Sequence, residues 1–155
     1  MENKIIITSG PTIEPIDPVR FLSNRSSGNT GFYIAEEAKK RKIGHVVFIT
    51  GPSRYIPDEI DVVKIESALE MKEHVLKYYN TSDIGIMAAA VSDFSRDKIY
   101  PEKIKKTKEN FTLKLVKNRH DRQINFVEEN IEEESEQKGK NISLELTESI
   151  GLTSP

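Results

Sequence analysis

The segment from Thr8 to Gly31 carries the side chains best suited to chemistry in this chain. It follows an apolar run, is rich in small residues, and contains Arg20 and Asn24. A strand, a loop of small residues and then a helix start is an arrangement that presents backbone N–H groups to phosphates. Arg20 is suited to clamp a carboxylate or phosphate, and Asn24 to donate its amide to an acyl oxygen where negative charge develops. The segment therefore predicts a nucleotide- or phosphate-handling enzyme domain.

Each of these residues also has a simpler interpretation. Arg20 taken alone is a surface residue, Asn24 a turn residue, and Gly51 a turn glycine. For residues 26–31, Ser-Ser-Gly-Asn-Thr-Gly, phosphate binding is favoured, because small side chains at a helix start let a phosphate approach the backbone. The pattern is neither Gly-x-Gly-x-x-Gly nor a Walker loop, which disfavours a nicotinamide dehydrogenase or a P-loop kinase.

A second candidate site follows the apolar segment 83–90. Three small residues end that segment: Ala88, Ala89 and Ala90. Ligands in open α/β sheets lie beyond the carboxyl ends of the strands, where alanines let a flat base or a sugar approach. Asp93 is a candidate to accept from a base or a ribose hydroxyl or to bind Mg²⁺; its simpler interpretation is a helix cap or turn residue.

A basic cluster at residues 101–106 contains three lysines. They are Lys103, Lys105 and Lys106. A charge run is usually a solvated face, but lysines just after a candidate base-binding strand also suit a triphosphate. His45, His74 and His120 are isolated, with no spacing typical of a zinc site, and the sequence assigns no metal ligands.

Composition excludes several classes of protein. The 155 residues fit one domain, and 23 basic against 25 acidic residues argue against a dedicated nucleic-acid binder. Residues 126–155 carry a net charge of −6, so residues 1–125 carry about +4, which suits anionic ligands. Cysteine is absent, no signal-peptide pattern opens the chain, and no apolar run approaches the ~20 residues that span a bilayer. We expect a cytoplasmic protein that binds neither nucleic acid nor membrane.

The elements alternate between strands and helices. Buried strands are expected at residues 4–8, 45–50, 61–65 and 83–90, and helices from near Phe32 to Lys42 and over residues 67–79, with Ser67 as N-cap. Near-continuous apolar strands joined by helices predict a Rossmann-like α/β fold, doubly wound around a mainly parallel sheet. Residues 111–116 alternate apolar and polar side chains, which predicts an exposed or antiparallel strand. We place the domain at residues 1–118 and interpret residues 119–155 as a polar, acidic tail, helical or disordered.

Together the motifs resemble the phosphopantothenate–cysteine ligase family. The matching segments lie in family order at residues 7–12, 14–24, 26–28, 49–52, 88–94, 101–106 and 115–118. The resemblance implies a two-step reaction: 4′-phosphopantothenate attacks the α-phosphate of CTP, or of ATP, and L-cysteine then displaces the nucleotide. It also implies Mg²⁺, a homodimer formed by the strand around residues 111–116, and a phosphopantothenoylcysteine decarboxylase as a separate or fused partner.

The resemblance carries roles to individual residues. Lys103 should contact the triphosphate, with Lys106 as a second cation. Asn24 should hold the acyl-nucleotide for aminolysis, and Arg20 should support its loop. The nucleotide site would comprise Gly10, Ser27, Gly28, Ala88, Ala89, Ala90 and Asp93.

The chain departs from the family pattern in two places. Asn29 stands where the glycine loop normally has a lysine, and the nearby Arg25 is a candidate to compensate. After Asn118 the usual Pro-Asp-Ile, helix and Gly-Phe-Ala-x-Glu motif are missing. The alternatives to a ligase are therefore a truncated, catalytically incompetent nucleotide-binding module of the same fold, and a scaffold whose acidic tail recruits a basic partner.

Overall fold

Three consecutive isoleucines, Ile5, Ile6 and Ile7, form the middle of the central strand β1. β-branched side chains favour extended backbone, and a strand covered on both faces needs apolar groups pointing both ways. All three are at most 1% exposed.

The computed structural model describes residues 2–105, 112–118 and 144–145. Its elements are β1 Lys4–Ser9, β2 Ile13–Asp17, β3 Arg20–Ser23, α1 Asn29–Lys40, β4 His45–Thr50, β5 Asp61–Lys64, α2 Ala68–Tyr79, β6 Ile84–Met87, β7 Phe94–Arg96, β8 Leu115–Lys117 and β9 Leu144–Glu145.

The main sheet has the strand order β5-β4-β1-β6-β9, with every neighbouring pair parallel. The chain runs from β1 outward to β4 and β5 and then returns to the other side of β1 to form β6. This reversal makes the β1–β6 junction the switch point of the sheet, where ligands of open α/β folds bind. The predicted doubly wound, mainly parallel sheet is confirmed.

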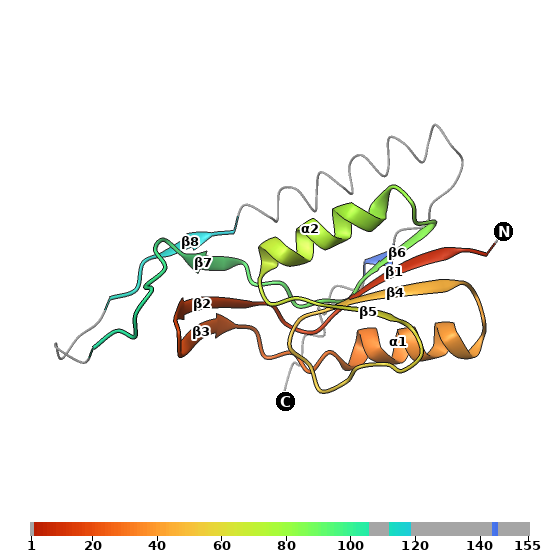
Figure 1. Ribbon diagram of the computed structural model, residues 1–155, viewed down its shortest axis with the longest axis horizontal. Coiled ribbons are helices and arrows are strands. Elements are labelled where there is room, and N and C mark those ends of the chain that lie inside the picture. Colours follow the sequence, from red (N-terminus) through yellow and green to blue (C-terminus); the bar gives the residue numbers. More distant parts are fainter. Residues whose placement is uncertain (1, 106–111, 119–143, 146–155) are drawn as a thin grey trace, which may run out of the picture.

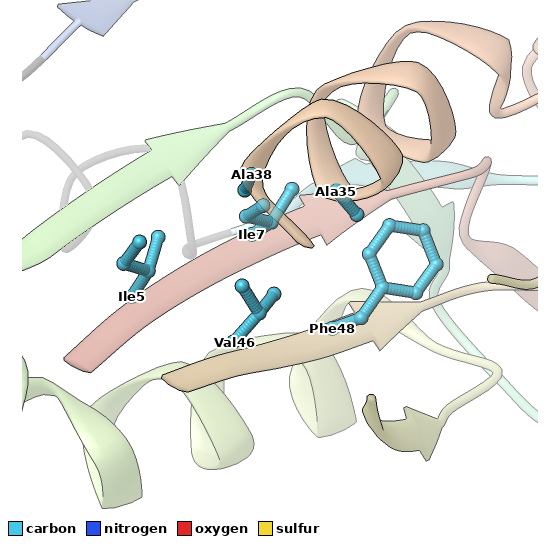
Figure 2. Packing of buried hydrophobic residues seen from close by; sticks show 6 residues of the cluster. All are labelled: Ile5, Ile7, Ala35, Ala38, Val46 and Phe48. Carbon is cyan, nitrogen blue, oxygen red and sulfur yellow. The ribbon is translucent and has the colours of Figure 1, made fainter. Parts of the chain in front are cut away.

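The two helices cover opposite faces of the sheet (Figure 1). Side chains alternate between the faces along each strand. On one face Ile5, Ile7, Val46 and Phe48 pack against Ala35 and Ala38 of α1 (Figure 2). On the other, Ile6, Val47 and Ile49 pack with Ile65 and with Met71 of α2. The small alanines of α1 let that helix lie close to the strands.

Both helices lie where the sequence pattern predicts them, with a shift at the start of α1. It begins at Asn29, three residues before the expected start near Phe32, because Gly28 serves as its N-cap with a φ of 80°. α2 begins after Ser67, whose hydroxyl accepts from the Glu70 N–H at 3.2 Å, as predicted. The Glu70 carboxylate in turn accepts from the Glu66 N–H at 2.8 Å, one residue before the cap.

The proline-rich segment after β1 forms an antiparallel hairpin of β2 and β3. Its prolines predict only stiff, extended backbone, and the pairing was not predicted from the sequence. Proline lacks an N–H and is normally confined to strands with a free edge. The two-stranded sheet provides that edge, since β2 pairs only with β3 there.

β7 and β8 form a second antiparallel ribbon, also beyond the parallel strands (Figure 1). The antiparallel strand expected at residues 111–116 is observed only from Leu115, as β8; residues 112–114 are described but form no strand, and Phe111 lies outside the described residues. In the predicted tail the structure describes Leu144 and Glu145, which pair with β6; the boundary at residue 118 stays a prediction. Neither helix of the described residues has the length and apolar character needed to cross a membrane.

Replacing Gly51 by alanine should destabilise the protein. A Cβ at Gly51 would overlap the Pro11 carbonyl oxygen, whereas one at Gly85 would meet only the Met87 methyl at 3.4 Å. We expect Gly51→Ala to lower the free energy of unfolding by at least about 2 kcal/mol in urea titrations. Gly85→Ala is the control and should change it by less than about 1 kcal/mol; equal effects would contradict the close approach.

Candidate functional site

Backbone pairing between β1 and β6 continues past the ends of both strands. The Ala88 N–H donates to the Thr8 carbonyl at 3.2 Å, and the Ala90 N–H to the Gly10 carbonyl at 2.9 Å. The Thr12 N–H then donates back to the Ala90 carbonyl at 3.2 Å. The three predicted alanines and Gly10 therefore lie side by side at the switch point of the sheet, as expected for a ligand site.

Three loops approach each other closely beside this ladder. The Gly28 Cα position faces Gly10, because a Cβ at Gly28 would lie 3.2 Å from the Gly10 Cα. Its φ of 80° is in the left-handed region that favours glycine. Gly51, interpreted from sequence as a turn residue, is held by its backbone approach to Pro11. At these glycines the three loops pack backbone against backbone, and Gly10, Gly28 and Gly51 are all buried.

The N-terminus of α1 follows directly from Gly28, which is its N-cap. In the fully described helix α1, the first turn carries no acidic residue and the N-cap offers no side-chain acceptor. The Ser27 hydroxyl accepts from the Asn29 N–H at 3.3 Å, and the Ser27 carbonyl accepts from the Ser53 hydroxyl at 2.8 Å. A helix start without an acidic side chain favours a bound anion through its dipole.

Asn24 lies against the alanine segment. Its Nδ2 donates to the Val91 carbonyl at 3.0 Å and to the Ala90 carbonyl at 3.4 Å. The structure thus brings together Asn24 and the predicted nucleotide strand. The amide is engaged with the protein, so its use on an acyl oxygen requires it to release at least one of these carbonyls.

Arg20 and Lys103 line one open hollow of about 370 Å³, together with Ile104 and Lys105. Arg20 starts β3 and Lys103 belongs to a loop more than eighty positions later in the chain. Asn24 follows the other end of β3. At about 3.3 Å per residue the two ends of this strand place Arg20 and Asn24 about 13 Å apart, so β3 connects the cationic hollow with the alanine segment.

The carboxylate of Asp17 fixes this hollow and was not predicted as a site residue. Its Oδ1 accepts from the N–H groups of Val19 and Arg20, both at 2.9 Å. Its Oδ2 accepts from the Arg20 guanidinium at 2.6 Å and from the Ile104 N–H at 3.1 Å. The Asp-Pro sequence that starts the turn was a signal for such an Asx turn, but the contact with Ile104 has no local signal.

Burial and hydrogen bonding act in opposite directions on the pKa of Asp17. Burial raises it. The N–H groups of Val19, Ile104 and Arg20 and the guanidinium charge lower it, and together they hold the pKa below its ordinary value of 3.8. The carboxylate is therefore ionised wherever the protein works near neutral pH.

Asp93 is exposed and comes directly before β7. Its carbonyl accepts from the Asn118 N–H at 2.7 Å, and the Asn118 amide donates to the Ser92 carbonyl, also at 2.7 Å. Asn118 is thus a buried anchor for the Ser92–Asp93 turn that sequence reasoning did not assign. Lys106, predicted as a second cation, lies outside the described residues.

The arrangement can hold two anionic groups. One would lie at the start of α1, and the other at the cations Arg20 and Lys103. Aligning two anions that otherwise repel is the main requirement for transferring a nucleotidyl group to a carboxylate.

Comparison with known proteins gives a consistent picture. A family model described as "DNA/pantothenate metabolism flavoprotein C-terminal domain" matches residues 1–142. The coenzyme A biosynthesis bifunctional protein CoaBC of Borreliella burgdorferi is 47% identical over 117 residues, covering 74% of this chain and 30% of that protein. CoaBC of Escherichia coli K12 is 43% identical over 118 residues, covering 74% of this chain and 29% of that protein. The chain thus spans under a third of the length of these curated relatives.

Solved structures are similar in fold. The crystal structure of the C-terminal domain of CoaBC is matched with a TM-score of 0.67 and 29% identity, over 91% of this chain and 75% of that one. The DNA/pantothenate metabolism flavoprotein from Streptococcus pneumoniae is matched with a TM-score of 0.64 at 24% identity, over 75% of this chain and 60% of that one. The second likeness supports the α/β fold alone.

The lowered pKa of Asp17 predicts a pH-dependent contribution to stability. A carboxylate with a depressed folded-state pKa stabilises the protein above its ordinary value of 3.8, and this contribution is lost as the pH falls through the folded-state value. The difference in free energy of unfolding between the protein and Asp17→Asn should be largest near neutral pH and shrink toward about pH 3. Urea titrations across this range test it, and a constant difference would contradict it.

Proposed function

Since the chain belongs to the DNA/pantothenate metabolism flavoprotein C-terminal domain family, we propose that it works as a phosphopantothenate–cysteine ligase in coenzyme A biosynthesis. The observation that carries this proposal is the meeting of Arg20 and Lys103 in one open hollow, connected by β3 to Asn24 and the alanine segment. A ligase that joins two anions needs cations at this place.

In the proposed reaction, a carboxylate oxygen of 4′-phosphopantothenate attacks the α-phosphorus of CTP or ATP. The bond from the α-phosphorus to the bridging oxygen breaks and pyrophosphate leaves, which gives an acyl-nucleotide. The amine of L-cysteine then attacks the acyl carbon, loses a proton, and displaces the nucleoside monophosphate. The product is an amide, and no oxidant or reductant is needed.

Each candidate residue has a place in this scheme. Lys103, with Lys106, would neutralise the triphosphate, and Arg20 would support the loop that holds the intermediate. Asn24 would hold the acyl-nucleotide for attack by the amine. The nucleotide site would comprise the segments of Gly10, Ser27, Gly28, Ala88, Ala89 and Ala90, with Asp93 at its edge.

Mg²⁺ enters this scheme with the nucleotide as part of the substrate. Among the described residues, no three His, Cys, Asp or Glu side chains gather as metal ligands. The chain's own residues there do not form a resident metal centre, and the scheme assigns no step to a protein-bound metal.

We also propose a homodimer that acts in the cytoplasm and passes its product to a phosphopantothenoylcysteine decarboxylase. The hairpin of β2 and β3 and the ribbon of β7 and β8 support the dimer through large apolar side chains that are exposed in the single chain. They are Val19, Phe21, Phe94 and Leu115, and Ile99 in the loop after β7 is also exposed. The ribbon register puts Phe94 and Leu115 on one face, since alternate residues of each strand share a face.

Removing the Lys103 charge should slow nucleotide activation strongly. With 4′-phosphopantothenate and Mg²⁺, we expect the protein to release pyrophosphate with CTP or ATP, and Lys103→Gln to lower the rate roughly 10²-fold. Lys40→Gln, at the opposite end of α1, is the matched control and should keep full activity. Release with one nucleotide would identify the cofactor. A folded protein that CTP stabilises against heat, but that releases no pyrophosphate with either nucleotide, would favour the incompetent binding module.

A charge on the exposed face of the ribbon should break the dimer. Leu115→Asp would bury an unpaired carboxylate in the proposed interface, which is strongly unfavourable. Sedimentation velocity should show a dimer for the protein and a monomer for this variant. The control is Leu69→Asp. Leu69 is another half-exposed leucine and lies in the first turn of α2, where an acidic residue is tolerated. This control should remain dimeric; a monomeric parent protein would refute the assembly.

A further inference from the structure

The Asp17 side chain is fully covered, with 0% of it exposed, although it is charged. Each of its two oxygens accepts from a different pair of donors. Oδ1 accepts from two backbone N–H groups of the turn between β2 and β3, which shapes the hairpin. Oδ2 accepts from the Arg20 guanidinium and from the Ile104 N–H, which lies immediately after Lys103. One carboxylate oxygen thus joins the two walls of the cationic hollow.

Arg20 and Lys103 line the same open space but belong to segments far apart in the chain, so the bonds between those segments set their spacing. The guanidinium of Arg20 reaches the Ile104 carbonyl only at 3.5 Å, which is a weak bond. The Tyr100 N–H donates to the Ile16 carbonyl at 3.1 Å and holds the start of the loop. The end of the loop that carries Lys103 is held by the bond from the Ile104 N–H to Asp17.

Asp17 has no access to a substrate. Its side chain is covered, and both oxygens are already engaged by protein donors. A role as general base or metal ligand would require these bonds to break. What the carboxylate can do is set the separation and orientation of the groups that it binds.

We propose that Asp17 is the positioning residue that holds the Arg20 guanidinium and the Lys103 loop at the spacing that binds the nucleotide triphosphate. The inference rests on the proposed function of Arg20 and Lys103. It adds a buried carboxylate that acts through both cations, and it explains why the hairpin of β2 and β3 lies against the lysine loop.

Glu14 provides a matched control on the same strand. It is also a buried carboxylate, 7% exposed, but its Oε1 accepts from the Ala68 N–H at 3.0 Å, at the start of α2. It therefore shares the burial and charge of Asp17 without touching the hollow. Glu14→Gln keeps an acceptor for Ala68, as Asp17→Asn keeps one for the turn.

The test measures pyrophosphate release while the nucleotide and L-cysteine are varied separately. We expect Asp17→Asn to raise the KM for the nucleotide about tenfold and to change the KM for cysteine less than about twofold. In the Lys103→Gln background, adding Asp17→Asn should raise the nucleotide KM clearly less than tenfold further, because only the part of its effect that passes through Arg20 remains. Glu14→Gln should leave the nucleotide KM unchanged.

Three results would overturn the role of Asp17: an unchanged nucleotide KM in Asp17→Asn, an equal rise in Glu14→Gln, or full additivity with Lys103→Gln. Circular dichroism confirms that each variant is folded at the assay temperature. If the parent protein releases no pyrophosphate, the ligase proposal fails. The role of Asp17 in holding the two cations is then tested separately, by calorimetric binding of inorganic triphosphate. A roughly tenfold loss of affinity confined to Asp17→Asn supports the inference; no binding by the parent, or equal losses in both variants, refutes it.

Discussion

The continued backbone pairing between the segments after β1 and β6 is the constraint on which the site depends. Strand β1 ends at Ser9 and strand β6 at Met87. Hydrogen bonds between the two segments nevertheless continue through Gly10, Ala90 and Thr12. The Thr12 hydroxyl, itself fully buried, then accepts from the Ser92 N–H at 2.8 Å. This ladder sets the direction in which both β2 and the strand β7 leave the sheet, and so places the hairpin and the ribbon on the same side of the molecule (Figure 1).

Buried polar residues attach the hairpin to the rest of the molecule. Ionised carboxylates are expensive to bury unless donors surround them. On β2, Glu14 accepts from the start of α2, and Asp17 accepts from the turn and from the lysine loop. An apolar hairpin could be packed in several ways, whereas these directed bonds fit one arrangement. The strand therefore fixes the relative positions of α2, the alanine segment and the cationic hollow.

Sequence reasoning succeeded where a pattern is local or repeated. Apolar runs with the right spacing predicted the four main strands and both helices, and Ser67 with Glu70 predicted the start of α2. The start of α1 was misplaced because Gly28 carries no side chain that marks a cap. The hairpin was missed because prolines normally argue against a strand, and a free edge is a property of the sheet and not of the segment.

By itself the sequence determined the fold class and the family, because burial on two faces and an ordered set of motifs are both properties of the linear chain. It also identified Arg20, Asn24 and Lys103 as candidates from their residue types. Only the tertiary structure brought Arg20 and Lys103 to one hollow and turned the Asn24 amide toward the Ala90 and Val91 carbonyls. Only folding revealed Asp17 between the Arg20 guanidinium and the loop of Lys103, since a contact between residues 17 and 104 follows from the packing of distant segments and leaves no local trace in the sequence.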